Sequence, residues 1–464
     1  IQYRGDFDEN FAKVLDATLK NERIPNRVER PSKGSLIDFS PIKSLSYEKV
    51  IAPILANKCL SCHSESVGLL PYLDTYDKVK GWASMAKETI LTDRMPPWSS
   101  DPLYGSYMND ISLTPEEKRV LVKWLDAGAP NADKVDPLVS ANEKLNFRRQ
   151  TLKRLKPIYS VKYTEKNIPP GGLIEYRYAQ IAGPIPYDMW ITGHQSSSTS
   201  PRQTHHEVIM VTSKPISFYE DIAKRHYDIN DSERKSNVDG VVPLYLLHAI
   251  NKYEIANNPD NYMRFLLTGG GMKQPKFHRP GLVIYIPKGS YFILEGHYMG
   301  TGKYEDATTT FEFYGHREKP VKAKHIRRHF VTAPNLVIPA GAKNYTVSTN
   351  TWVPNKNIHI ININGYLHMR GTSIRTELKG PREINPKTII SVPNYFYGWG
   401  TGSYLVNKEA IAVKSGSELK ATCHFDNSTQ NPYNPDPTKI IRFGQRVDRS
   451  EMCIMHIMYT VDEE

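Results

Sequence analysis

The spacing of apolar residues changes once along the chain, near residue 155. Between residues 41 and 135 apolar positions recur three and four apart, which is typical of amphipathic helices. The segment Thr114–Ala127 is the clearest case, because it opens with an N-cap threonine, a first-turn proline and a glutamate three residues after the cap. Gly128 then stands where a helix would end. We therefore predict an α-helical domain over residues 41–135.

Beyond residue 155 the pattern is that of short β-strands. Runs such as Tyr291–Tyr298 and Glu418–His424 alternate with turns rich in Gly, Pro and Asn. About 300 residues of this pattern favour two antiparallel β-sandwiches, at residues 156–320 and 321–464. The predicted fold class is therefore multidomain, an α-helical domain followed by two sandwiches. The polar residues 1–40 are expected to form an N-terminal arm and residues 136–155 a linker.

Charge and hydropathy exclude some classes of function. The chain carries 60 Lys and Arg against 49 Asp and Glu, but these basic residues are spread out and no nucleic-acid-binding motif accompanies them. We expect a basic surface suited to an acidic redox partner, and no nucleic acid. No run of about 18 apolar residues predicts a transmembrane segment. The chain starts at Ile1 without a charged and apolar leader, as a mature secreted protein would.

The strongest motif is Cys59-Leu60-Ser61-Cys62-His63, the C-x-x-C-H pattern of haem c attachment. In that chemistry the two thiols bond covalently to the haem and the adjacent histidine ligates the iron. A zinc-binding or redox C-x-x-C is the alternative, which the following histidine and the helical surroundings disfavour. The sequence therefore predicts one covalent haem c held by Cys59, Cys62 and His63.

Met95 is our candidate for the second iron ligand. It lies in Arg94-Met95-Pro96-Pro97-Trp98, where two prolines would stiffen the backbone that presents its thioether. Met85 and Met108 are the alternatives. With this methionine, residues 41–135 resemble the small single-haem cytochromes c. The resemblance implies a cytochrome c domain whose low-spin haem carries electrons.

Imidazole and thioether side chains recur through the β-rich part of the chain. His205 and His206 are adjacent at the start of an apolar run, so both reach one ion only if the strand turns or bulges there. His297 ends a predicted strand, and His368-Met369 and Met452-Cys453 follow later. Imidazoles and thioethers without carboxylates suit copper better than zinc or calcium. We therefore expect copper binding.

In this order, these residues resemble the copper type II, ascorbate-dependent monooxygenases, which include peptidylglycine α-hydroxylating monooxygenase and dopamine β-monooxygenase. The resemblance covers roughly residues 156–464 and is closest to bacterial proteins in which a cytochrome c domain precedes such a module. It implies an electron-donating copper on His205, His206 and His297. It implies a second, oxygen-binding copper on a His-x-His pair and Met452.

The chain departs from this family at the second site, where Tyr366-Leu367-His368 stands in place of His-x-His. The resemblance makes Tyr366, His368 and Met452 the candidate catalytic residues of a site that either has another donor or has been lost. His424 is the nearest replacement ligand, and His359 and His456 are more remote ones. A tyrosine ligates copper weakly when neutral and firmly as a phenolate.

Two further cysteines, Cys423 and Cys453, lie near the C-terminus. If they pair, the closed loop stabilises the fold by roughly 3–4 kcal/mol. The resemblance implies this disulfide, which would hold the strand that presents Met452. A disulfide and a thioether-bound haem both indicate an oxidising compartment, so we expect a periplasmic or secreted protein.

Together these features predict a haem–copper oxidoreductase. We expect an O2-dependent copper monooxygenase, with one or two copper ions, that its own haem supplies with electrons. A non-catalytic electron-transfer or copper-binding protein with a degenerate second site is one alternative. A substrate oxidase that passes electrons out through the haem is another. No motif identifies the small-molecule or peptide substrate.

Overall fold

The protein is described by a computed structural model. It covers residues 45–67, 70–132, 135–171, 175–219, 263–269, 275–399, 404–406, 410–444 and 446–462. The arm predicted at residues 1–40 lies outside the described residues.

The described chain begins with a helical part. Its helices are η1 (Tyr47–Ile51, a π-helical turn), α2 (Ala52–Lys58), α3 (Tyr76–Gly81), α4 (Ala83–Leu91), α5 (Pro115–Asp126) and α6 (Pro137–Lys153). They surround a small apolar core in which Trp124 stacks on Tyr47, with ring centroids 5.7 Å apart. Helix α5 begins at the predicted capping box, in which the side chains of Thr114 and Glu117 each bond the other's backbone N–H.

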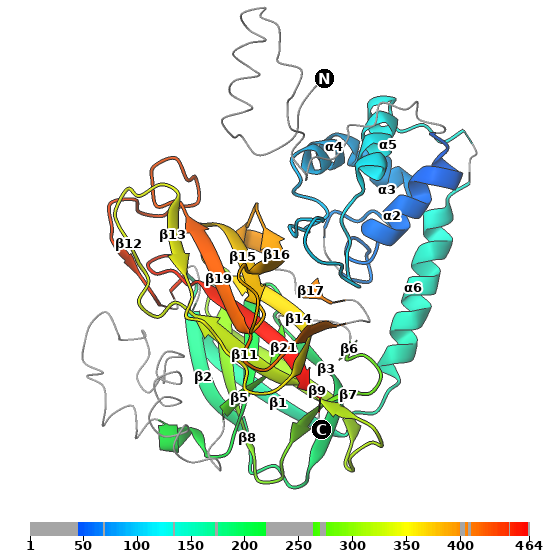
Figure 1. Cartoon of the computed structure of the whole chain (residues 1–464). Coiled ribbons are helices and arrows are strands. Elements are labelled where there is room, and N and C mark those ends of the chain that lie inside the picture. The colour runs from blue at the N-terminus through cyan, green and yellow to red at the C-terminus, as the bar shows by residue number, and fades with distance from the viewer. Residues whose placement is uncertain are drawn as a thin grey trace, which may run out of the picture.

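Residues 136–155, expected as a linker, mostly form helix α6. Asp136 caps this helix, and its carboxylate also accepts hydrogen bonds from the Tyr47 hydroxyl at 2.7 Å and the Tyr76 N–H. From that anchor α6 runs from the other helices toward the sheets (Figure 1). The connection is therefore a rigid element fixed to the helical part.

The first pair of sheets begins the β-rich part. A six-stranded sheet has the order β1 (Tyr159–Ile168), β9 (Glu305–His316), β3 (Met189–Ser198), β7 (Leu282–Ile286) and β10 (Lys324–His325), with β6 (Lys276–Phe277) paired to β3. A four-stranded sheet has the order β2 (Glu175–Ala182), β8 (Tyr291–Tyr298), β4 (Thr204–Thr212) and β5 (Met263–Gly269). Their apolar faces enclose one core, in which Ile191 and Phe313 meet Ile209 and Leu294.

The second pair of sheets follows. A five-stranded sheet has the order β11 (Arg327–Thr332), β21 (Ile454–Val461), β14 (Ile358–Tyr366) and β17 (Tyr404–Leu405), with β18 (Ile411–Val413) paired to β14. A four-stranded sheet has the order β13 (Tyr345–Ser348), β19 (Glu418–Phe425), β15 (Gly371–Lys379) and β16 (Lys387–Val392). A small sheet joins β12 (Val337–Ile338) to β20 (Ile441–Arg442), and the 3-10 helix η3 spans Tyr397–Trp399.

The predicted fold class, a cytochrome c domain followed by two antiparallel β-sandwiches, is wrong. The structure is mostly β, because strands, arranged in several sheets, account for 37% of it and helices for 18%. No helical cytochrome domain is evident in the described part. The two pairs of sheets are not closed off from each other, because Ile326 and Ile361 of the second region pack in the core of the first pair. Apolar periodicity reports which face of each element is buried, but not how many layers share one core.

Residues 98–107 attach the helical part to the second pair of sheets. The Asp101 N–H donates to the Ser391 carbonyl at 2.8 Å, and the Tyr107 hydroxyl donates to the Ile389 carbonyl at 3.3 Å. Tyr107 itself belongs to the core of the second pair. Among the described helices, none is long and apolar enough to cross a membrane.

Candidate functional site

The C-x-x-C-H motif forms the loop that ends helix α2. Cys59 caps the helix, its N–H bonding the Leu55 carbonyl at 2.9 Å, and the His63 N–H bonds the Cys59 carbonyl at 3.0 Å. Both Cys59 and Cys62 are partly exposed and neither forms a disulfide. The loop therefore presents two thiols and an imidazole within one turn of backbone.

The His63 ring has a defined orientation and tautomer. Its Nδ1 lies 2.8 Å from the carbonyl oxygen of Pro71, and because a carbonyl only accepts, Nδ1 carries the proton. The lone pair is then on Nε2, the atom that a metal ligand uses when its other ring nitrogen is anchored in this way. Only 9% of the His63 surface is exposed, so the ring points into the helical part rather than into solvent.

Helix α6 supports this loop through Arg149. The buried guanidinium donates to the Ser61 carbonyl at 3.0 Å and to the Ser64 hydroxyl at 2.9 Å, on either side of Cys62 and His63. Burial lowers the pKa of Arg149, but the group stays protonated at neutral pH. The far end of the supposed linker thus fixes the conformation of the motif.

The state of the Cys59 thiol bears on the zinc alternative. Burial, and secondarily the neighbouring Cys62, raise the pKa of Cys59 to about 12, so this thiol is protonated at neutral pH. Zinc binds thiolates. Because zinc displaces the proton from a thiol that it binds, the haem and the zinc alternatives both stay open for this loop.

The methionine candidates lie in different surroundings. Met95 is partly buried, its N–H bonds the Thr89 carbonyl at 3.1 Å, and it follows helix α4 at the wall of a large cavity. Met85 is 53% exposed on helix α4. Met108 is 48% exposed and its sulfur accepts a contact from Arg279 at 3.8 Å. Of the three, Met95 is the most shielded from solvent.

Strands β4 and β8 bring together the first histidine group. The ladder between them is irregular between Thr204 and His206, so a bulge lies at His205, as a shared ion on both histidines would need. His206 is directly opposite His297, with ring centroids 5.1 Å apart. Burial, then His297 and His205, lower the pKa of His206 to about 3, which keeps this imidazole neutral. His297 Nε2 lies 2.7 Å from a carboxylate oxygen of Glu295.

The second group lies just past the end of β14. His368 is buried, and its Nδ1 donates to the Ser450 carbonyl at 2.9 Å. Burial lowers its pKa to about 4, and the nearby charges of Arg370 and His297 add to this effect. The charge of His297 therefore reaches His368.

Glu451 organises the backbone around His368. Its carboxylate accepts the N–H groups of His368 at 2.8 Å and Arg370 at 2.7 Å. Burial raises the pKa of Glu451 to about 8, against these hydrogen bonds, which favour the charged form. The buried Arg370 in turn donates to the Asn427 side chain at 3.1 Å and the Asp448 carbonyl at 3.1 Å. The turn that carries His368 is thus bonded to the segment that carries Met452.

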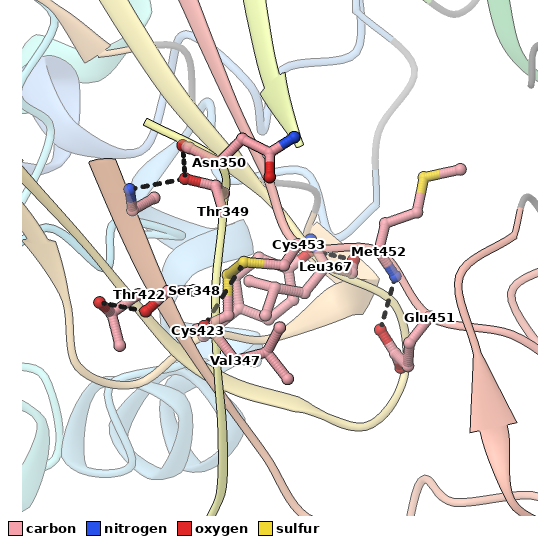
Figure 2. The surroundings of a disulfide bond; sticks show 12 residues. Val347, Ser348, Thr349, Asn350, Leu367, Thr422, Cys423, Glu451, Met452 and Cys453 are labelled. Carbon is pink, nitrogen blue, oxygen red and sulfur yellow. Dashed lines mark hydrogen bonds between the residues drawn. A yellow bond between two sulfur atoms is a disulfide. The ribbon is translucent and has the colours of Figure 1, made fainter. Parts of the chain in front are cut away.

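The disulfide implied for Cys423 and Cys453 is present and lies beside this turn. Figure 2 shows the bond packed against Leu367, while the Met452 side chain extends away from the two disulfide sulfur atoms. The ring of Tyr366 is edge-on to His368 at 5.4 Å between centroids, and that of Tyr397 lies at 6.2 Å. Two phenol rings therefore flank the buried imidazole.

The replacement histidines do not join His368. His424 is on strand β19, where its neighbours Cys423 and Phe425 face the core, and its Nδ1 lies 3.1 Å from the Thr346 hydroxyl. His359 pairs with Asp462 at 2.6 Å near the surface. His456 stacks on Phe330, with centroids 4.4 Å apart.

The fit of copper to these groups is incomplete. His206 and His297 are close enough to share an ion, and His205 is coupled to both electrostatically. Yet, within the described part of the chain, no three His, Cys, Asp or Glu side chains converge as a metal site requires. The three-histidine site and the second site, as the side chains stand, do not fit a fully ligated copper.

Sequence reasoning missed Arg149, Arg370 and Tyr397. Their partners are far away along the chain, so no local motif marks them. Glu451 adjoins Met452, but only the fold shows that its carboxylate binds the backbone of His368.

No family model matches the chain, and no curated protein matches it. The resemblance to the copper monooxygenases therefore stays a prediction. Structures similar to parts of the chain include an archaeal virus protein described by its triple jelly roll fold and turret assembly (9% identity, 65% of this chain and 60% of that chain, TM-score 0.17). A structure of Sulfolobus turreted icosahedral virus is 7% identical, with 64% of this chain and 59% of that chain covered and a TM-score of 0.17. The structure of PNGF-II is 9% identical, with 66% of this chain and 65% of that chain covered and a TM-score of 0.27.

The chain spans 59% to 65% of the length of these three structures. At such identities and scores the likenesses carry no argument about fold family or activity.

Proposed function

We propose that this chain is a redox protein with one covalently bound haem c. Cys59 and Cys62 would form the thioethers, His63 would ligate the iron through Nε2, and Met95 would be the second axial ligand. The observation that carries the proposal is the hydrogen bond from His63 Nδ1 to the Pro71 carbonyl, which leaves Nε2 as the metal-binding atom. When bound, such a haem supplies one-electron transfer.

The chain's own residues prepare this chemistry. Arg149 holds the backbone on both sides of Cys62 and His63, and burial of His63 excludes water from its ring. Residues 98–107 attach the segment after Met95 to the second pair of sheets. Both proposed ligands therefore lie on segments that the fold holds in place.

The proposed compartment is the periplasm or the extracellular space. The disulfide between Cys423 and Cys453 supports an oxidising environment, and thioether attachment of haem belongs to the same setting. The basic surface supports an acidic protein as the redox partner.

A haem–copper oxidoreductase, with the monooxygenase chemistry expected from the sequence, is the second candidate function. The bulge at His205 and the pairing of His206 with His297 favour copper at the first group. We derive no step through copper, because three ligands do not converge. A haem protein without copper catalysis corresponds to the electron-transfer alternative, and it is the function that the geometry supports best.

The test is to express the full chain with c-type haem maturation in the periplasm and to measure its mass and metals. We expect the intact mass to exceed the polypeptide by one haem after denaturation, with one iron per chain. The variant Cys59→Ser/Cys62→Ser should lose the added mass, whereas Cys423→Ser/Cys453→Ser should keep it. A wild-type chain that matures without added mass would overturn the proposal. Copper measured on the same samples decides the second candidate.

A further inference from the structure

A cavity of about 1270 Å³ separates the segment after helix α4 from the second pair of sheets. It is somewhat larger than most small-molecule pockets, which enclose roughly 300–1,000 Å³. One wall comes from residues 92–104 and includes Met95 and Trp98. The opposite wall comes from residues 369–372 and 393–398 and includes Tyr395 and Tyr397.

Both walls are held in place by contacts outside the cavity. Trp98 packs edge-on against Tyr107, with centroids 6.0 Å apart, and Tyr107 is anchored in the core of the second pair of sheets. On the other side the Tyr395 hydroxyl exchanges hydrogen bonds with the backbone of Leu367, receiving its N–H at 3.1 Å. The cavity is therefore preformed.

Aromatic rings form a distinct part of the lining. Six aromatic side chains border the space, from both walls: Trp98, Tyr104, Tyr395, Phe396, Tyr397 and Tyr433. Phe396 and Tyr433 pack edge-to-face on each other at 5.0 Å between centroids. Such rings favour a ligand that is itself flat and aromatic, because offset and edge-to-face ring contacts add to the burial of apolar area.

Both cations of the cavity lining pair with carboxylates. Lys118 pairs with Asp93 at 2.6 Å, and Arg94 pairs with Glu88. The carboxylates of Asp101 and Asp426 accept backbone N–H groups within their own turns. With its cations already paired, the cavity has little to offer an anionic ligand.

We propose that this cavity binds an uncharged aromatic compound. The ligand would contact Trp98 on one wall and Tyr397 on the other. Tyr397 in turn lies 6.2 Å from the His368 ring, between centroids. The cavity thus places its ligand between the segment that follows helix α4 and the tyrosine next to the buried His368. This inference goes beyond the proposed function, since the lining binds an aromatic ring whether or not haem is attached.

The test uses 2-naphthol, an uncharged fluorescent phenol, titrated with the full chain as purified. Thr372 lines the cavity, and Thr372→Trp would place a bulky ring in the space between its two walls. Thr388 on the neighbouring strand β16 lies outside the lining, so Thr388→Trp is the matched control. We expect 2-naphthol to bind wild type and the control alike, and Thr372→Trp to bind about tenfold more weakly or not at all.

A second variant, Tyr433→Ala, removes a half-exposed ring and does not depend on packing a new tryptophan. It should weaken 2-naphthol binding severalfold, and 2-naphthoate should bind wild type more weakly than 2-naphthol does. Absence of 2-naphthol binding, equal binding by Thr372→Trp and wild type, or tighter binding of 2-naphthoate would each overturn the inference.

Discussion

His63 and Pro71 are joined by a hydrogen bond of 2.8 Å between Nδ1 and the carbonyl oxygen. The bond links the C-x-x-C-H loop to the segment that follows it and decides which ring nitrogen can bind iron. In a surface histidine with a freely rotating ring, either nitrogen could bind a metal. The relationship is therefore more specific than the motif alone.

Replacing His63 separates haem attachment from iron ligation. In His63→Ala the two thioethers should still form, but the iron should lose a strong-field ligand and become high-spin, as the visible absorption spectrum would show. Added imidazole should restore the low-spin spectrum. His359→Ala, at a half-buried histidine that contacts Asp462, is the control and should leave the spectrum unchanged. An unaltered spectrum in His63→Ala would show that another residue ligates the iron.

Arg149 should contribute measurably to stability. Arg149→Ala removes charged hydrogen bonds to Ser61 and Ser64, and we expect a loss of about 2 kcal/mol in the free energy of unfolding. Its exposed neighbour Arg148 offers a matched control, and Arg148→Ala should change stability by no more than about 0.5 kcal/mol. Urea titration followed by far-UV circular dichroism measures both. Equal effects of the two substitutions would contradict the role assigned to Arg149.

The disulfide should stabilise the second pair of sheets. It closes a loop between residues 30 apart in sequence, so Cys423→Ala/Cys453→Ala should lose roughly 3–4 kcal/mol. Reducing agent should lower the urea midpoint of the wild type and have no effect on the double variant. If reductant destabilised both proteins equally, the effect would not come from this bond.

Acid should destabilise the protein through His194 and His278. Their rings lie 6.2 Å apart between centroids, and burial, followed by the charge of His278, lowers the pKa of His194 from 6.5 to about 3. Between those values the unfolded chain binds a proton that the folded chain does not. The stability contribution is therefore complete above pH 6.5 and is lost as the pH falls toward 3.

The slope of the unfolding free energy against pH tests whether His194 is the group responsible. His194→Asn should reduce the dependence of the unfolding free energy on pH by about 1.4 kcal/mol per unit between pH 6 and 4. His316→Asn, at an exposed histidine, is the control. Urea midpoints measured across this range provide the comparison. An unchanged slope in His194→Asn would mean that His194 is already charged in the folded state.

Local signals in the sequence identified several elements correctly. Helix α5 begins at the predicted cap, strand β8 has the predicted bounds Tyr291–Tyr298, and the bond between Cys423 and Cys453 forms. These features depend on neighbouring residues or, for the disulfide, on a resemblance in the residues around Met452. A bulge at His205 was a condition for both adjacent histidines to reach one ion, and the structure has a bulge there.

Tertiary structure alone decided the rest. The helix over the expected linker, the sharing of one core by sheets from both regions and the cavity beside Tyr397 all arise from which faces pack together. Arg149 reaches Ser64 across 85 residues of sequence, and no periodicity of apolar positions encodes such a contact. Caps and attachment motifs depend on neighbouring residues and can be recognised in the sequence. The packing of layers depends on burying all apolar faces together, so it is determined only in the folded chain.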